Sequence, residues 1–496
     1  MIYWGTSFGS HDAALSVFTT DRIGPIIYDR LIFASHSERF SRIKDDANLC
    51  QELIDHAIQK YGHPNRVYYY EKPWKKKLRY IKSGQWDNIT EPSPRKTLAE
   101  FGVHAPIITV DHHHSHAAAG YYTSGFRNAT IIVVDAIGEL ATTTMWIGKN
   151  DKIKKVYQQN YPHSIGLFYS ALTQAAGYKP NGEEYIFMGA AAYGKKEPLK
   201  TFIAEQLIEL QHKQPLVKLK QNLHRGYKDL YARPPHDIAA AGQSIYEDCL
   251  DHLVNYAYKN FRTKNLILMG GCALNCVANS RVLQSGLWEN IWIMPNPGDA
   301  GSAVGTVLAA RGNHIEWPGP YLGYNIPGPY PIGDAIQILK TKGIVGIANG
   351  PAEFGPRALG NRSIFADPRI PDIKTQMNWL KKREQFRPFA AIIPEQFAAQ
   401  EFVMGNAKTS PYMQFVFECK HPQLYPGITH VDNTSRIQTV SPQQHPKLYE
   451  MLMGWYQETG CPMLINTSLN IKGQPLVNTE DDARAFEVCY DTPVLK

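Results

Sequence analysis

Four histidines stand within five residues of the chain, at positions 112, 113, 114 and 116. A predicted strand, residues 106–110, precedes them, and small residues typical of a helix follow. On that helix His112 and His116 are four residues apart and share one face. Two imidazoles so placed can hold one metal ion and leave positions for carboxylates and substrate. We therefore predict a metal site, against the alternative of a packed helix start with solvent-facing histidines.

Glycine turns that carry an acid supply candidate carboxylates. Asp135 follows the predicted strand 131–134, and Asp299 lies in the turn 295–301 behind the predicted strand 291–294. Carboxylates complete the ligand sets of borderline metals, so these turns strengthen the prediction of a metal site.

Strand–turn units recur through the first 300 residues. The first hairpin turn, residues 7–12, could offer N–H groups and hydroxyls to a phosphate, although a plain hairpin turn is the alternative. Two strand–turn–strand units and two strand–glycine–helix units predict a duplicated α/β core with a nucleotide between its halves. The predicted strands are 2–6, 13–18, 131–134, 142–147, 266–269 and 291–294.

Apolar spacing of three and four residues predicts helices over 199–211 and 238–261. Residues 68–80 interleave basic and aromatic side chains, which is typical of a nucleic-acid surface. An exposed helix start after a buried strand has the same composition, so this alternative stays open.

The Pro/Gly-rich residues 317–331 predict a domain boundary, and the chemistry changes after it. Residues 355–362 imitate a P-loop, but they contain a proline and end in Asn-Arg, which excludes a Walker motif. Cations beside glycine and proline turns predict an anion pocket with bidentate contacts. They are Arg357, Arg362, Arg369, Lys381, Lys382, Arg383, Arg387 and Arg436, with the polar loop 466–468 behind them.

Composition sets the outer bounds. The 496 residues suffice for two or three domains, and 43% hydrophobic with 20% charged residues is typical of a soluble globular protein. No apolar run approaches the ~20 residues that span a bilayer, which predicts no membrane partner. The N-terminus lacks a basic region and cleavage site, and seven scattered cysteines suit a cytoplasmic protein. The net charge of +7 permits an anionic partner without requiring one.

Taken together, the motifs resemble, over nearly the whole length, the O-carbamoyltransferases of nodulation-factor and antibiotic tailoring pathways. The matching stretches are GSHDAA (9–14), SERFSRIK (37–44), DHHHSHA (111–117), FMGAAAYG (187–194), GGCALNC (270–276), PGDAG (297–301), residues 353–367, REQFRPFA (383–390), THVD (429–432) and NTSLN (466–470). The family usually has lysine before the Met-Gly of the fourth stretch, where this chain has Ile186.

The resemblance implies an α/β architecture with an actin-like ATPase domain of duplicated RNase H-like units at residues 1–316. A Pro/Gly-rich linker at 317–332 and an α+β YrdC-like domain at 333–496 would follow. The second domain would activate carbamoyl phosphate with ATP as carbamoyl-adenylate, releasing pyrophosphate. The first would transfer the carbamoyl group to an acceptor hydroxyl.

The resemblance also implies roles for individual residues. His112, His116, Asp135 and Asp299 would bind iron or another divalent metal, with magnesium an option for the nucleotide. His11 would activate the acceptor, and its imidazole can serve as a base because it titrates near neutral pH. Gly270, Gly271 and Asn275 would lie against adenosine. Arg357, Lys381, Arg387, Arg436, Asn466 and Ser468 would hold carbamoyl phosphate and the adenylate.

The acceptor is open at this point. With 52 Lys+Arg against 45 Asp+Glu and the basic–aromatic stretch, a hydroxymethylcytosine in DNA is one hypothesis, and a small-molecule sugar or antibiotic hydroxyl is the other. Synthesis of threonylcarbamoyl-adenosine in tRNA uses the same two domain types in separate chains, so fusion argues against it. A nucleotide-binding regulator without catalysis is a further alternative. The oligomeric state is also open, and a homodimer is compatible with the sequence.

Overall fold

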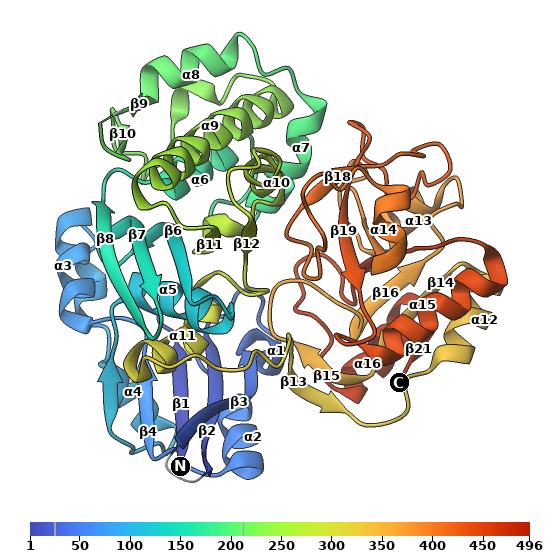
Figure 1. Cartoon of the computed structure of the whole chain (residues 1–496), viewed down its shortest axis with the longest axis horizontal. Coiled ribbons are helices and arrows are strands. Elements are labelled where there is room, and N and C mark those ends of the chain that lie inside the picture. The colour runs from blue at the N-terminus through green and yellow to red at the C-terminus, as the bar shows by residue number, and fades with distance from the viewer. Residues whose placement is uncertain (24–25, 212) are drawn as a thin grey trace.

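The structure is a computed structural model that describes residues 1–23, 26–211 and 213–496. Figure 1 shows the N-terminal part in blue to yellow beside the C-terminal part in orange and red. No helix among the described residues is both long enough and apolar enough to cross a bilayer.

The first sheet is a meander extended by two parallel strands. Its order is β3-β2-β1-β4-β5; β1, β2 and β3 are antiparallel neighbours, and β4 and β5 run parallel to β1. The strands are β1 (Ile2–Ser7), β2 (Ala14–Ile23), β3 (Ile26–His36), β4 (Arg66–Tyr69) and β5 (Ile107–Thr109). Five of the six residues of β1 are buried, as expected for a central strand covered on both faces.

The second sheet repeats this pattern. Its order is β12-β11-β6-β7-β8, with an antiparallel meander β6-β7-β8 and parallel β11 and β12 beside β6. The strands are β6 (Asn128–Gly138), β7 (Ala141–Lys149), β8 (Lys152–Asn160), β11 (Asn265–Met269) and β12 (Asn290–Trp292). The identical order and directions confirm the predicted duplication of an α/β unit.

The last helix of each unit packs on the sheet of the other unit. Helix α5 (His112–Thr123) follows β5 but packs on β6 and β11, and α11 (Asp299–Arg311) follows β12 but packs on β1 and β2. The two helices also contact each other, because a Cβ at Gly305 would lie only 1.9 Å from the carbonyl oxygen of Ser115. Both helices therefore begin between the sheets, with His112 and Asp299 as their first residues.

A group of helices is inserted between β8 and β12, as Figure 1 shows at the top of the molecule. They are α6 (Ile165–Ala175), α7 (Glu184–Ala190), α8 (Leu199–Leu207), α9 (Pro235–Phe261) and α10 (Cys276–Gln284). The predicted helix 238–261 lies within α9. The predicted helix 199–211 is too long: the backbone becomes extended at Ile208, and β9 (Ile208–Leu210) pairs with β10 (Val217–Leu219).

The C-terminal part is built on one mixed sheet of seven strands, in the order β18-β19-β17-β20-β16-β14-β21. The strands are β14 (Ile344–Ala348), β16 (Arg362–Ala366), β17 (Ala390–Pro394), β18 (Val416–Glu418), β19 (Thr434–Val440), β20 (Leu464–Ser468) and β21 (Val494–Leu495). The helices are α12 (Ile332–Lys342), α13 (Ile373–Leu380), α14 (Glu395–Glu401), α15 (Pro446–Thr459) and α16 (Glu480–Tyr490). The segment predicted as a linker contains β13 (Tyr321–Ile326), which pairs with β15 (Gly350–Glu353), so part of it is regular sheet.

The basic–aromatic stretch is mostly turned inward. Its tyrosines at 68–70 are buried at the end of β4, and its basic residues continue on α3 (Pro73–Ser83). Lys76 and Arg79 are buried, and Lys72 and Lys75 both pair with Asp111. The alternative of a helix after a buried strand therefore describes this stretch, and Trp74 and Lys77 remain on the exposed face of α3.

Candidate active site

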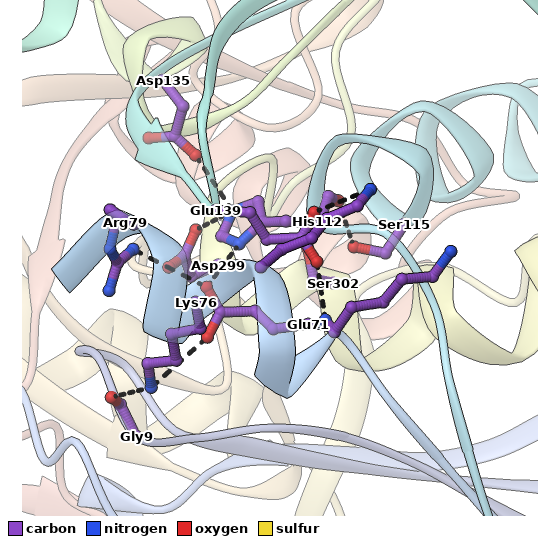
Figure 2. A network of polar contacts seen from close by, with 12 residues as sticks. Gly9, Glu71, Lys76, Arg79, His112, Ser115, Asp135, Glu139, Asp299 and Ser302 are labelled. Carbon is purple, nitrogen blue, oxygen red and sulfur yellow. Dashed lines mark hydrogen bonds and ion pairs between the residues drawn. The ribbon is translucent and has the colours of Figure 1, made fainter. Parts of the chain in front are cut away.

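The histidine pair and the two acids meet between the sheets. The Nε2 atoms of His112 and His116 are 3.1 Å apart. His112 Nε2 lies 3.2 Å from Asp299 and 3.5 Å from Asp135, and His116 Nε2 lies 3.3 Å and 3.2 Å from the same carboxylates. All four side chains are buried, and Figure 2 shows His112 with both acids. The four residues are called the ligand cluster below.

The ligand cluster fits a divalent cation. A tetrahedral ion bound to nitrogen at about 2.1 Å has donors about 3.4 Å apart, close to the separations above. Oδ2 of Asp135 is buried and, apart from the two imidazole nitrogens of the cluster, has no polar partner among the described residues. Two imidazole nitrogens at 3.1 Å repel each other unless a proton or a cation lies between them. Two nitrogen and two carboxylate donors suit iron and similar metals.

Outer contacts orient the ligands. His112 Nδ1 lies 3.4 Å from Glu71 Oε1, and His116 Nδ1 lies 3.3 Å from Ser302 Oγ. The backbone N–H of Ala136 donates to Asp135 Oδ1 at 2.8 Å. Such partners hold each imidazole with Nε2 facing the other members of the cluster, where a cation would bind. Sequence reasoning missed Glu71 and Ser302, since no spacing pattern links them to the histidines.

The charges of the ligand cluster stabilise one another. Although burial alone lowers the pKa of His112, the neighbouring carboxylates, Asp299 foremost, raise it well above its usual range. Burial opposes ionisation of Asp299 as well, yet the imidazoles hold its pKa well below the usual range. Protons thus compensate the carboxylates in the absence of a cation, and metal binding must displace them.

His11 lies on the turn between β1 and β2, with about half of its side chain exposed to a cavity. Its Nδ1 is 3.0 Å from Asp12 Oδ2. Burial of the ring lowers its pKa, but the hydrogen bond to Asp12 and the charges of Asp299, Asp12 and Asp135 outweigh burial and raise the pKa to about 10. With the ligand cluster free of a cation, His11 is therefore an imidazolium at neutral pH.

That cavity joins the two parts of the chain. It has a volume of about 410 Å³ and is lined by His11, Asp135, Asp299, Gly271 and Asn275 from the N-terminal part. On the other side its lining includes Arg357, Lys381, Arg383, Arg387, Arg436, Asn466 and Ser468. A second cavity of about 470 Å³ shares Arg357, Arg383, Arg387, Arg436 and Asn466 and extends toward α7 and α9.

The shared wall of arginines has few counter-charges. Arg387 lies 3.6 Å from Glu384, while Arg357, Arg383 and Arg436 have no ion pair among the described residues. Burial and the neighbouring Arg436 lower the pKa of Arg357 to about 9, and burial with the charge of Arg387 lowers that of Arg383. Clustered guanidinium groups without carboxylates are typical of a site for an anion.

Lys381 and Asn466 also support the cavity wall. Lys381 Nζ donates to the carbonyl oxygen of Ser468 and, at 2.8 Å, to that of Asn470. The Asn466 amide donates to Ala358 and Gln438 at 3.1 Å and 2.7 Å. Its Oδ1 has no partner among the described residues and is left to accept from a ligand.

Two predicted residues have structural roles beside the cavity. Gly270 has φ +88°, and a Cβ there would lie 2.2 Å from the carbonyl oxygen of Val134, so it forms the turn beside Asp135. Asn275 lines the cavity and also caps α10, accepting from Ala278 N–H at 3.0 Å.

Two arginines of the predicted anion pocket lie elsewhere. Arg362 is fully buried and donates to backbone carbonyls, including Tyr324 at 2.9 Å, and Arg369 pairs with Asp367 at 2.8 Å. The prediction that they belong to the anion pocket was wrong, because their guanidinium groups are bound to backbone carbonyls and to Asp367. Arg383 donates from Nε to Asn378 Oδ1 at 2.6 Å but has no carboxylate partner among the described residues, and it lines both cavities.

Comparison with known proteins gives two family matches. The model described as Carbamoyltransferase N-terminus matches residues 65–308, and the model described as Carbamoyltransferase C-terminus matches residues 336–494. Among curated relatives, an uncharacterized protein of Synechocystis is 32% identical over 96% of this chain and 93% of its own length. The nodulation protein NolNO of Sinorhizobium fredii is 29% identical over 94% of this chain and 76% of its own. Nodulation protein U of the same species is 35% identical over 49% of this chain and 47% of its own.

Proposed function

Because this chain belongs to the carbamoyltransferase family, and is accordingly a carbamoyltransferase, we propose that it transfers the carbamoyl group from an adenylate to a hydroxyl. The observation that carries this proposal is the cavity with arginines on one wall that have few counter-charges among the described residues, and with His11 and the ligand cluster on the other wall. Such a cavity brings an anionic carbamoyl donor and an acceptor-activating group to the same space.

The first step of the proposal is activation at the arginine wall. Water cleaves carbamoyl phosphate to carbamate and phosphate, and a carbamate oxygen then attacks the α-phosphorus of ATP, releasing pyrophosphate and forming carbamoyl-adenylate. Arg357, Arg383, Arg387 and Arg436 would neutralise the phosphates of both substrates. Lys381 and Ser468 would form the floor of this site.

The second step is transfer at His11. The acceptor oxygen attacks the carbamoyl carbon, its proton passes to His11, and AMP leaves with the carbon–oxygen electron pair. A divalent cation bound by the ligand cluster would supply positive charge against the adenylate phosphate. His11 accepts a proton only in its neutral form, so the carboxylates that raise its pKa must have their charge compensated.

The proposal includes the two fold assignments. The repeated strand order and the exchanged helices α5 and α11 support an actin-like ATPase architecture for residues 1–316. The mixed seven-stranded sheet is compatible with a YrdC-like domain in residues 333–496.

For the acceptor we retain a hydroxymethylcytosine in DNA, with a sugar or antibiotic hydroxyl as the alternative. Exposed Trp74 and Lys77 on α3 support a nucleic-acid contact, whereas the inward-facing part of the stretch does not. Hydroxymethylcytosine DNA and free sugars should be incubated in parallel with carbamoyl phosphate and ATP. A mass shift of one carbamoyl group on the digested nucleoside supports DNA, and a shift on the sugars alone supports the small-molecule class.

Separation of the two steps tests the mechanism. Arg436→Ala should abolish pyrophosphate release, and the adenylate with it. His11→Ala should keep pyrophosphate release near the wild-type rate and lose transfer by about 100-fold, the scale of general base catalysis. Equal loss of both activities in both variants would contradict two centres.

A further inference from the structure

One buried ammonium group lies between the loop that carries His11 and the ligand cluster. Lys76 Nζ, on α3, donates to the carbonyl oxygen of Gly9 at 2.6 Å and pairs with Glu71 Oε2 at 3.4 Å. Gly9 precedes His11 by two residues, and the other oxygen of Glu71 contacts His112 Nδ1 at 3.4 Å. Figure 2 shows this chain of contacts from Gly9 through Lys76 and Glu71 to His112.

We propose that Lys76 is a positioning residue that sets the place of the His11 loop relative to the ligand cluster, with Glu71 as the link to His112. This inference rests on the proposed function, because it concerns the geometry of the transfer step. It adds a role for α3, whose lysines sequence reasoning associated with a surface.

Lys76 and Glu71 are both buried, so the loss of their contact should affect the position of Glu71. The Glu71 side chain is 0% exposed and that of Lys76 is 7% exposed. A buried carboxylate needs nearby cations, and removal of one of them leaves its charge less well compensated. Arg79 is farther from Glu71, at 3.8 Å, so Lys76 is the nearer of these two basic side chains.

Glu71 passes this effect to the ligand cluster. An acceptor at Nδ1 keeps the proton on that nitrogen and leaves the Nε2 lone pair of His112 free for a cation. If Lys76 is removed, Glu71 is free to shift toward Arg79, and the orientation of His112 is less defined. Metal affinity is therefore a direct readout that does not depend on catalysis.

The His11 loop has other attachments, so it should remain folded without Lys76. Tyr69 Oη donates to the carbonyl oxygen of Phe8 at 3.0 Å, and the N–H of Gly9 donates to Ala47 at 2.7 Å. Lys76 also pairs with Glu91 at 3.1 Å. Loss of the ammonium should displace the loop rather than unfold the domain.

Lys76→Met in the full-length chain tests the inference. Binding of Fe²⁺ or Mn²⁺, measured by calorimetry under anaerobic conditions, should weaken by about 10-fold, and kcat for transfer should fall by about 10- to 100-fold, as for other outer-shell partners. KM for carbamoyl phosphate and the rate of pyrophosphate release should stay within about twofold of wild type, because the arginine wall is untouched. Lys82→Met, at an exposed position near the end of α3, is the control and should change none of these.

The outcomes separate the alternatives. Lys76→Arg, which keeps a cation, should recover part of the metal affinity and of kcat. Unchanged metal affinity and kcat in Lys76→Met, or equal losses of pyrophosphate release and transfer with a lower Tm, would overturn the inference. Should Lys76→Met fail to fold, Glu71→Gln tests the same link, and unchanged metal affinity there would overturn it too. If wild type transfers no carbamoyl group, the proposed function fails while the metal-affinity comparison still decides the role of Lys76.

Discussion

At the scale of single residues, both ring nitrogens of His112 and of His116 have a polar neighbour. Their Nε2 atoms converge with two carboxylates, and their Nδ1 atoms each contact a polar side chain. Neighbouring His114 lies outside this arrangement, with its ring stacked on Trp146 at 5.2 Å. The helix thus presents the i and i+4 histidines to the cluster and a third histidine to a different environment.

The histidine pair should be needed for metal binding and for the transfer step, but not for the activation step. His112→Ala combined with His116→Ala should purify without a stoichiometric metal, measured by elemental analysis, and should lose transfer. Pyrophosphate release at the arginine wall should persist. His114→Ala is the control and should retain metal. Normal transfer by the double variant would show that the cluster is structural.

The titration of His11 should depend on the cation. Its pKa is raised from 6.5 to about 10 by Asp12, Asp299 and Asp135, so the folded, metal-free protein favours the imidazolium. That contribution to stability is present below pH 6.5 and is lost as the pH rises through about 10. A cation bound to Asp135 and Asp299 would compensate their negative charge, so the pKa of His11 should fall when the cation is bound.

NMR titration of the His11 ring, assigned with a His11→Gln variant, checks this prediction. Zn²⁺, which is diamagnetic, is used here in place of Mn²⁺. The midpoint of the titration should lie at lower pH in the Zn²⁺-bound protein than in the metal-free protein. Equal midpoints in the two states would mean that the carboxylates do not act on His11.

At the scale of elements, the exchange of α5 and α11 creates the site. Each helix begins with a ligand-cluster residue, and each rests on the other unit's sheet. Gly305 permits this contact, because the backbones of the two helices approach too closely for a side chain there. Small residues between the helices are therefore a condition for the cluster geometry.

Gly305→Val should force α5 and α11 apart. We expect a loss of about 1–3 kcal/mol in the free energy of unfolding, the usual cost of overpacking, and a loss of metal affinity at the same time. Denaturant unfolding and calorimetry with Mn²⁺ measure the two effects. Gly333→Ala in α12 is the control, since nothing lies within 4 Å of its added Cβ, and it should leave both quantities near wild type.

At the scale of the whole molecule, a few side chains tie the two parts together around the shared cavity. Arg39 donates to the carbonyl oxygen of Gly355 at 2.9 Å. Arg42 donates to the carbonyl oxygen of Leu476 at 2.6 Å and lies 3.4 Å from Asp482. These contacts close the cavity on the side of the SERFSRIK segment.

Arg42→Ala should loosen this closure and uncouple the two steps. Pyrophosphate release should continue, while carbamoylated product per pyrophosphate should fall by several-fold because the adenylate is lost to water. The ratio of the two products in one reaction is the measurement. Arg30→Ala, on β3 with a mostly exposed side chain, is the control and should keep the wild-type ratio. An unchanged ratio in Arg42→Ala would assign the coupling to other contacts.

The sequence alone was sufficient to predict features that depend on residues close together in the chain. Strands and glycine turns follow from apolar runs and turn residues, and the duplicated core was predicted from their recurrence. The histidine pair follows from helical spacing, which places i and i+4 on one face. The helix expected over 199–211 was too long because pairing with β10 outweighed local propensity at Ile208.

Only the tertiary structure decided which charged side chains are available to bind a ligand. In sequence, Arg362 and Arg357 look alike, but buried backbone carbonyls use the first, whereas the second faces the cavity. Likewise Lys76 lies in a stretch typical of a surface, yet it is buried against Glu71. The physical reason is that the role of a charge depends on its desolvation and its partners, and both come from residues far apart in the chain.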